Sequence, residues 1–211
     1  MDVLTSSTNK SFKYNHKMLN TSSDEYKLVK YFFDTNCSEA NAISDFKVYR
    51  IFENNEDSTV ANESRNNLML MHGTKKENVE GILKKGFINS KEGKFGQGVY
   101  MTDCSDVAFH RCLVSRDTGG YKYIFVNEVL ESEKIKVVNH KFHAFNKADT
   151  KPEDKFQKHE MEGSKQLSEK DYRVDAQGRR YRNVSHNWVI MHDEYLADES
   201  ITIPRYLIKL K

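Results

Sequence analysis

LMLMHGTKKENVEGILKKGF, at residues 68–87, carries the signals of a strand, a turn and a helix in direct succession. Residues 68–71 form an apolar run of the length expected for a buried strand. Thr74 and Glu77 have the spacing of a capping box, which is typical of a helix start. The apolar positions that follow recur at helical spacing and are Val79, Ile82 and Leu83. Gly86 stands where such a helix is expected to end.

Two further stretches extend this pattern. GKFGQGVYMTD, at residues 93–103, predicts a glycine-punctuated loop that leads into a short strand, and its glycine spacing is not the dinucleotide-binding fingerprint. DEYLADESITIPRYLI, at residues 193–208, ends in a β-prone run. Each stretch alone is compatible with an ordinary turn or strand end. Only their order and combination therefore carry information about function.

The rest of the chain predicts the fold class. The expected strands are residues 46–52, 123–130, 135–138, 188–191 and 203–210, and the other expected helices are residues 22–34 and 107–114. The first of these helices would begin with a capping box from Ser22 to Glu25. Residues 146–183 are charged and predict a loop. We therefore expect an α+β fold with mixed or antiparallel β-sheets and short helices clustered in the N-terminal half.

Domain organisation follows from composition. Residues 1–21 are rich in Ser, Thr, Asn and Lys, which predicts a flexible N-terminal tail, and residues 22–211 are expected to form one domain. No signal peptide or membrane-spanning run is visible, and three cysteines do not form a disulfide framework. An intracellular location, cytoplasmic or nuclear, is therefore expected. The formal net charge of +2 gives no strong nucleic-acid signal.

The three stretches together resemble the catalytic domain of the poly(ADP-ribose) polymerase (PARP) family, the diphtheria-toxin-like ADP-ribosyltransferases. The resemblance covers about residues 24–211 and is densest in HGTKKENVEGILKKGF and FGQGVYMTD. It implies a PARP-like ADP-ribosyltransferase fold and an enzyme that consumes NAD as its substrate, with no metal. ADP-ribose would pass to protein acceptors, possibly including this chain itself, in single units or short chains. About seventy residues precede His72, so we expect no helical regulatory subdomain.

The resemblance also implies roles for individual residues. The catalytic triad of the family would fall on His72, Tyr100 and Glu194. A carboxylate beside the ribose can stabilise the positive charge that develops as nicotinamide leaves, which suits Glu194. The ring of Tyr100 offers a surface for nicotinamide stacking, and His72 can hydrogen-bond a ribose hydroxyl. The NAD-binding set implied by the resemblance is His72, Gly73, Thr74, Tyr100, Ala108 and Arg111.

Three positions depart from the family pattern. Ala108 stands where the family often has a serine that contacts the carboxamide, and Arg111 replaces a second stacking aromatic residue. Both changes predict a weaker grip on nicotinamide. The segment after Glu194 is one residue short, and a rival alignment places Asn187 in the glutamate position, where no charge would be available. We favour Glu194, because the similarity is local on both sides of it.

Other functions stay open at this point. A catalytically inactive protein that binds NAD or ADP-ribose would fit Ala108 and Arg111. An RNA-terminal phosphate ADP-ribosyltransferase is a third possibility, which the near-neutral charge disfavours. Cys104, His110 and Cys112 lie around one expected helix without zinc-ligand spacing, so structural cysteines are favoured over a metal site.

Overall fold

The computed structural model describes residues 11–35, 37, 40–53, 67–90, 97–112, 120–130, 135–144, 172–174, 180–182, 189–197 and 199–211. Within residues 135–144, 172–174, 180–182 and 189–194 only the backbone is described. The helices are α1 (Asp24–Thr35), α2 (Lys76–Lys85) and α3 (Ser105–Arg111), with 3₁₀ turns η1 (Ala40–Ala42) and η4 (Glu199–Ile201). The strands are β1 (Tyr14–Met18), β2 (Phe46–Glu53), β3 (Leu68–Thr74), β4 (Val99–Thr102), β5 (Lys122–Val129), β6 (Ile135–Ala144), β7 (Tyr172–Val174), β8 (Arg180–Arg182), β9 (Val189–Ala197) and β10 (Thr202–Leu210).

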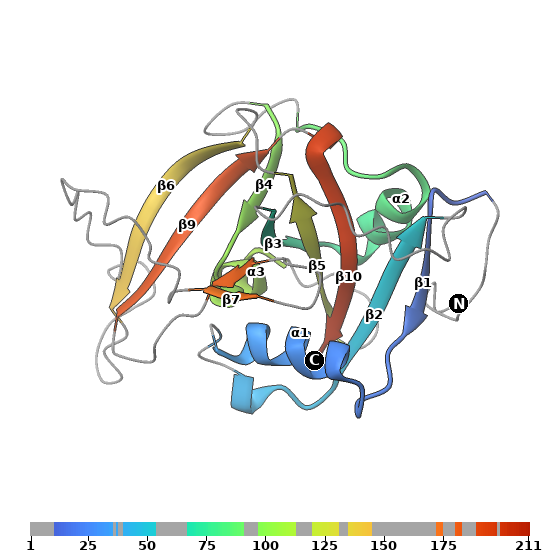
Figure 1. Cartoon of the computed structure of the whole chain (residues 1–211), viewed down its shortest axis with the longest axis horizontal. Helices are drawn as coiled ribbons and strands as arrows, with labels where there is room; N and C mark the ends of the chain where they lie inside the picture. The colour runs from blue at the N-terminus through green and yellow to red at the C-terminus, as the bar shows by residue number, and fades with distance from the viewer. Residues whose placement is uncertain are drawn as a thin grey trace.

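The strands form one twisted sheet in the order β1-β2-β10-β5-β3-β4-β9-β6, in which neighbours are antiparallel (Figure 1). β8 adds a parallel pairing to the start of β3 and an antiparallel pairing to β7. The helices of the described residues all precede residue 112. The predicted α+β class, with a mixed and mainly antiparallel sheet and early helices, is confirmed.

The sheet separates two apolar clusters, one on each face. Alternate residues of β5 enter different clusters, as the two-residue repeat of a strand requires. Phe125 packs in the cluster that contains α2, whereas Ile124 packs in the cluster that contains α1 and α3. Both side chains are fully buried. β5 and its neighbour β3, whose Leu70 and Met71 also lie in different clusters, are therefore supported from both sides.

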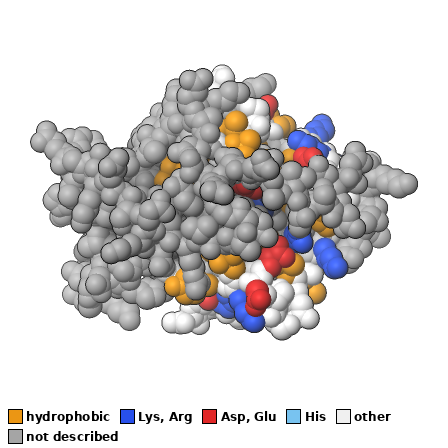
Figure 2. Space-filling view, in the orientation of Figure 1, with side chains coloured by type: hydrophobic (Ala, Val, Ile, Leu, Met, Phe, Trp, Pro, Cys, Tyr) orange, Lys and Arg blue, Asp and Glu red, His pale blue; other side chains and the backbone are white. Residues whose placement is uncertain are grey.

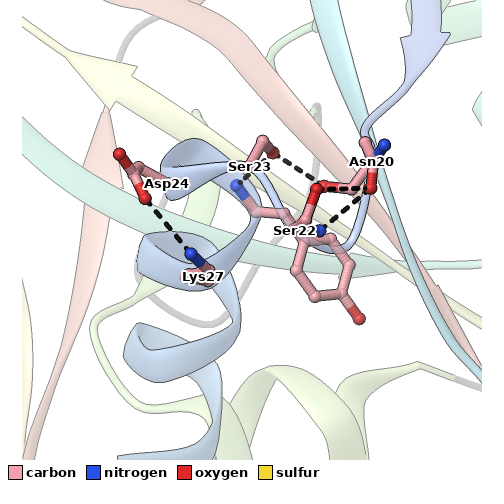
Figure 3. Close-up of polar contacts among 6 residues, drawn as sticks. Asn20, Ser22, Ser23, Asp24 and Lys27 are labelled. Carbon is pink, nitrogen blue, oxygen red and sulfur yellow. Dashed lines mark hydrogen bonds and ion pairs between the residues drawn. The ribbon is translucent and has the colours of Figure 1, made fainter.

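The start of α1 differs from the predicted capping box (Figure 3). Ser23, rather than Ser22, caps the helix, because its Oγ accepts a hydrogen bond from the backbone N–H of Tyr26 at 3.2 Å and donates one to the carbonyl of Asn20 at 2.7 Å. Glu25 takes no part in the cap. Its carboxylate instead accepts a 2.9 Å hydrogen bond from the Tyr206 hydroxyl and so joins α1 to β10.

The predicted capping box of α2 is also wrong, but its predicted end is confirmed. Thr74 is the last residue of β3, and its hydroxyl accepts a hydrogen bond from the side-chain amide of Asn78 at 3.3 Å. The N-cap is Lys75, whose side chain makes no capping hydrogen bond. Gly86 ends the helix with a φ of 87°, and its N–H donates to the carbonyl of Ile82 at 2.8 Å.

Two predicted irregular regions contain strands. The expected tail at residues 1–21 includes β1, which pairs with β2 and buries Tyr14 and His16, so the prediction is wrong for residues 14–18. Residues 1–10 lie outside the described residues. The expected loop at 146–183 contains β7 and β8. β1 is specified by its pairing with β2 rather than by its own short sequence, whereas β7 and β8 pair with each other.

The described part of the face in Figure 2 shows basic and acidic side chains interspersed with hydrophobic ones, in keeping with a near-balanced composition. No helix among the described residues combines the length and the apolar character that a membrane crossing requires.

Candidate active site

The candidate site lies where β3 and β4 separate. In the part of the chain that the structure describes, these strands share one register pair, Met71 opposite Thr102. One residue further along β3, a side chain bridges the two strands, because Nδ1 of His72 lies 2.8 Å from the backbone carbonyl oxygen of Tyr100. Two of the residues expected to act together, 28 positions apart in sequence, are therefore in direct contact.

The contact fixes the chemical state of the imidazole. A carbonyl oxygen can only accept a hydrogen bond, so Nδ1 of His72 carries the proton and Nε2 is left as an acceptor. Burial lowers the pKa of His72 below its ordinary value, with the hydrogen bond to Tyr100 as a smaller opposing cause. His72 is therefore neutral at physiological pH, in the form that can accept a hydrogen bond from a hydroxyl group.

Aromatic packing holds the same ring in place. The ring of Phe87 meets His72 edge-on, with centroids 5.2 Å apart and an interplanar angle of 78°. Phe87 in turn packs edge-on against Phe125, at 5.6 Å. Since Phe125 lies opposite His72 in the β3–β5 ladder, the imidazole is supported by strand pairing and by two rings.

Gly73 is required by the approach of α3. A Cβ atom at this position would lie 2.1 Å from the carbonyl oxygen of Ala108 and 3.0 Å from Sγ of Cys112. The helix backbone thus rests directly on the Cα of Gly73, and only glycine allows this approach. On its other side Gly73 pairs with Ile124 of β5. The structure therefore brings together Gly73 and Ala108, both expected to face nicotinamide.

The other expected binding residues occupy different environments. Thr74 is buried, with its hydroxyl engaged by Asn78. Ala108 is also buried, and its side chain carries no hydroxyl. Tyr100 is half-buried on β4, whereas Arg111 is exposed at the last residue of α3.

Glu194 lies within the strand that borders β4. The expected strand at 188–191, which the rival alignment uses, and the segment around Glu194 belong to one strand, because β9 runs from Val189 to Ala197. Its backbone register places Glu194 opposite Thr102 and, on the other side, opposite Asn139 of β6. Asn187 lies outside the described residues. A single cross-strand row, Met71–Thr102–Glu194, therefore links the three strands that carry His72, Tyr100 and Glu194.

Gly98 maintains this register at the start of β4. Its φ of 149° disfavours other residues, and a Cβ atom there would lie 2.7 Å from Cδ1 of Leu196. The close contact brings the beginning of β4 against β9, two residues from Glu194. The glycine-punctuated loop predicted from the sequence thus contributes one glycine with a defined structural task.

With this geometry in place, the comparison with known families is decisive. The family model described as the poly(ADP-ribose) polymerase catalytic domain matches residues 23–211. The chain belongs to this family. Membership assigns the PARP domain to the ADP-ribosyltransferases, which use NAD as their substrate. No curated protein matches the sequence at a significant level.

The cysteines of the PARP domain are structural within the described residues. Cys37, Cys104 and Cys112 are buried free thiols. Burial raises the pKa of Cys104 to about 12 and that of Cys112 to about 11, so both are protonated thiols at neutral pH. Among the described residues, no group of three or more His, Cys, Asp or Glu side chains could hold a metal ion.

Sequence reasoning missed three residues that pack around the candidate site. Phe87 packs on His72, Cys112 contacts the Gly73 position, and Lys122 of β5 contacts α3 through Phe109. Phe87 could have been found from the sequence, because it is an aromatic residue directly after Gly86, where the helix was expected to end. Nothing in the local sequence marks the other two, because their contacts join separate elements.

Proposed function

We propose that this PARP domain is an active NAD-dependent protein ADP-ribosyltransferase that releases nicotinamide. The observation that carries the proposal is the row Met71–Thr102–Glu194, together with the hydrogen bond from His72 to Tyr100. Directly opposite residues of antiparallel strands have Cα atoms about 5 Å apart. The register therefore brings the backbone of Glu194 next to β4, which supports a role for this residue at a sugar bound beside β3 and β4.

The residues fit the parts of NAD that the reaction requires. Nε2 of neutral His72 can accept a hydrogen bond from a ribose hydroxyl, and the backbone N–H and C=O of Gly73 can pair with the carboxamide. The Tyr100 ring can stack on nicotinamide. These groups bind the dinucleotide in one orientation, which places the glycosidic bond near Glu194.

The transfer then needs one bond broken and one formed. The bond between ribose C1′ and the nicotinamide nitrogen breaks, and its electron pair leaves with the neutral base. The acceptor oxygen or nitrogen forms the new bond to C1′ and loses a proton, for which the Glu194 carboxylate is the proposed base. The same negative charge stabilises the positive charge that builds on the ribose.

Labelled NAD and intact-mass analysis test the proposal. The wild-type chain should release nicotinamide and gain whole ADP-ribose units, on itself or on added protein. Glu194→Gln should lose at least about a hundredfold in rate, whereas Asp193→Asn, the neighbouring carboxylate, should retain activity. Equal rates for wild type and Glu194→Gln would remove the catalytic assignment. The masses also distinguish single units from short chains.

A binding protein without catalysis is the second candidate. Ala108 is buried and offers no hydroxyl to the carboxamide, and Arg111 is exposed where a stacking ring would strengthen the grip. Calorimetric binding of NAD without release of nicotinamide would favour this candidate. We further propose an intracellular site of action, cytosolic or nuclear, which the three buried free thiols support.

A further inference from the structure

α3 must be held in place from outside. It has seven residues, about two turns, and helices of this length are not stable by themselves in water. Its first turn is tied to β4, because the N–H of Cys104 donates to Oγ1 of Thr102 at 3.1 Å. Its last turn carries Ala108 and Arg111, two residues expected to face nicotinamide. The contacts at this end therefore set the geometry of that subsite.

Three contacts among the described residues help to hold the last turn. The carbonyl of Ala108 rests on Gly73, as described above. Sγ of Cys112 lies 3.2 Å from the same carbonyl and 3.0 Å from the carbonyl of Tyr123, which opposes Thr74 in the ladder. The third contact comes from Lys122, the first residue of β5.

The ammonium of Lys122 makes two interactions with one residue. Its Nζ lies 3.1 Å from the centroid of the Phe109 ring and 3.4 Å from the Phe109 carbonyl oxygen. The first is a cation–π interaction, and the second satisfies a carbonyl in the last turn of a helix, where positive charge is favourable. Lys122 is half-buried, so its charge can be removed without opening a cavity in the core.

We propose that Lys122 is a positioning residue of the ADP-ribosyl transfer. It holds the last turn of α3 so that Ala108 and Arg111 keep their positions relative to Gly73. This inference rests on the proposed function, because it assigns a role in the nicotinamide subsite. Loss of the ammonium would let the last turn shift relative to Gly73. Contacts with nicotinamide that exist equally in the ground state and the transition state would weaken, so KM would rise while kcat would change little.

The test compares Lys122→Met, which keeps the length of the side chain, with Lys122→Arg, which restores a cation. Lys122→Met should raise the KM for NAD about five- to tenfold with kcat within about twofold of wild type. Lys122→Arg should recover most of the loss. The affinity for free nicotinamide, measured by calorimetry, should fall in parallel. Because nicotinamide is neutral, this readout separates positioning from long-range attraction of the dinucleotide.

Lys30→Met is the matched control. Lys30 also lies over a phenylalanine ring, that of Phe46 at 4.9 Å, but it belongs to α1. It should leave the KM unchanged. An unchanged KM and nicotinamide affinity in Lys122→Met would overturn the inference while leaving the proposed function intact. A loss confined to kcat or to melting temperature would also overturn it, whereas a wild-type chain that neither binds nor consumes NAD would contradict the proposed function itself.

Discussion

The carbonyl oxygen of Ala108 on α3 occupies the space next to the Cα of Gly73 on β3, 2.1 Å from where a Cβ atom would stand. This single contact gives Gly73 a structural reason to be glycine, in addition to the backbone approach of nicotinamide proposed above. Any side chain at this position would displace α3, and with it Ala108 and Arg111. We therefore expect stability and NAD affinity to be coupled at Gly73.

Gly73→Ala should destabilise the domain by about 2 kcal/mol and weaken NAD binding together, because the backbone of α3 has to move away. Gly81→Ala is the control, since a Cβ atom at Gly81 in α2 would meet nothing within 4 Å. That variant should be stabilised by about 0.5–1 kcal/mol. Chemical unfolding and calorimetric NAD titration measure both effects. Wild-type NAD affinity in Gly73→Ala would contradict the coupling.

His72 should make stability depend on pH. Burial holds its pKa in the folded protein below the ordinary histidine value of 6.5, so unfolding takes up a proton once the pH is below that value. The free energy of unfolding is therefore greatest above pH 6.5 and falls as the pH drops towards the folded pKa. His72→Asn, whose amide can still donate to Tyr100, should flatten this slope by up to about 1.4 kcal/mol per pH unit.

Urea unfolding between about pH 7 and pH 5 measures this slope. An identical slope in wild type and His72→Asn would show that His72 does not titrate differently on unfolding.

A buried charge pair should show strong coupling. Nε of Arg205, at the bulge of β10, lies 2.6 Å from Oε2 of Glu128, and the Asn67 amide donates to Oε1 at 2.5 Å. Glu128→Gln should lower the free energy of unfolding by about 2–3 kcal/mol, because it leaves Arg205 without its counter-charge. The loss is not larger because part of the Arg205 side chain reaches solvent. The double variant Glu128→Gln/Arg205→Met should cost less than the sum of the single changes. Strict additivity in the thermodynamic cycle would contradict the coupling.

Arg111→Tyr should strengthen the grip on NAD. The nicotinamide ring of NAD is positively charged, so a neutral ring beside it is more favourable than a guanidinium. Arg111 is exposed, and the exchange should leave the fold unchanged. We expect the KM to fall about three- to tenfold, as measured by nicotinamide release. Arg50→Tyr, at an exposed position of β2, is the control, and an unchanged KM in Arg111→Tyr would place Arg111 outside the nicotinamide subsite.

Local patterns predicted much of the fold. The strand expected at 123–130 is β5, at Lys122–Val129, and the strand expected at 203–210 is β10, at Thr202–Leu210. Both are apolar, rich in β-branched and aromatic residues, and buried, so their own composition specifies them. The end of α2 at Gly86 was likewise predictable, because it depends on one glycine conformation.

Features that depend on distant partners were not predictable in the same way. β1 has few apolar residues and forms through its pairing with β2. Glu25, expected to cap α1, instead accepts a hydrogen bond from Tyr206, 181 positions away. The identity of His72, Tyr100 and Glu194 as candidates came from the resemblance to a family. Their arrangement depends on the ladder from β3 through β4 to β9, which no local pattern encodes.

The sparse junction between β3 and β4 has an evolutionary consequence. Within the described chain, the Met71–Thr102 pair and the His72–Tyr100 contact join β3 to β4, which in turn pairs with β9, the strand of the proposed base Glu194. The cluster around α1 and α3 includes no described residue of β4 or β9. We therefore expect that substitutions at this seam can change the reach of the proposed base, Glu194, towards different acceptors while that cluster stays intact, so that acceptor choice would be an adaptable trait in such a domain.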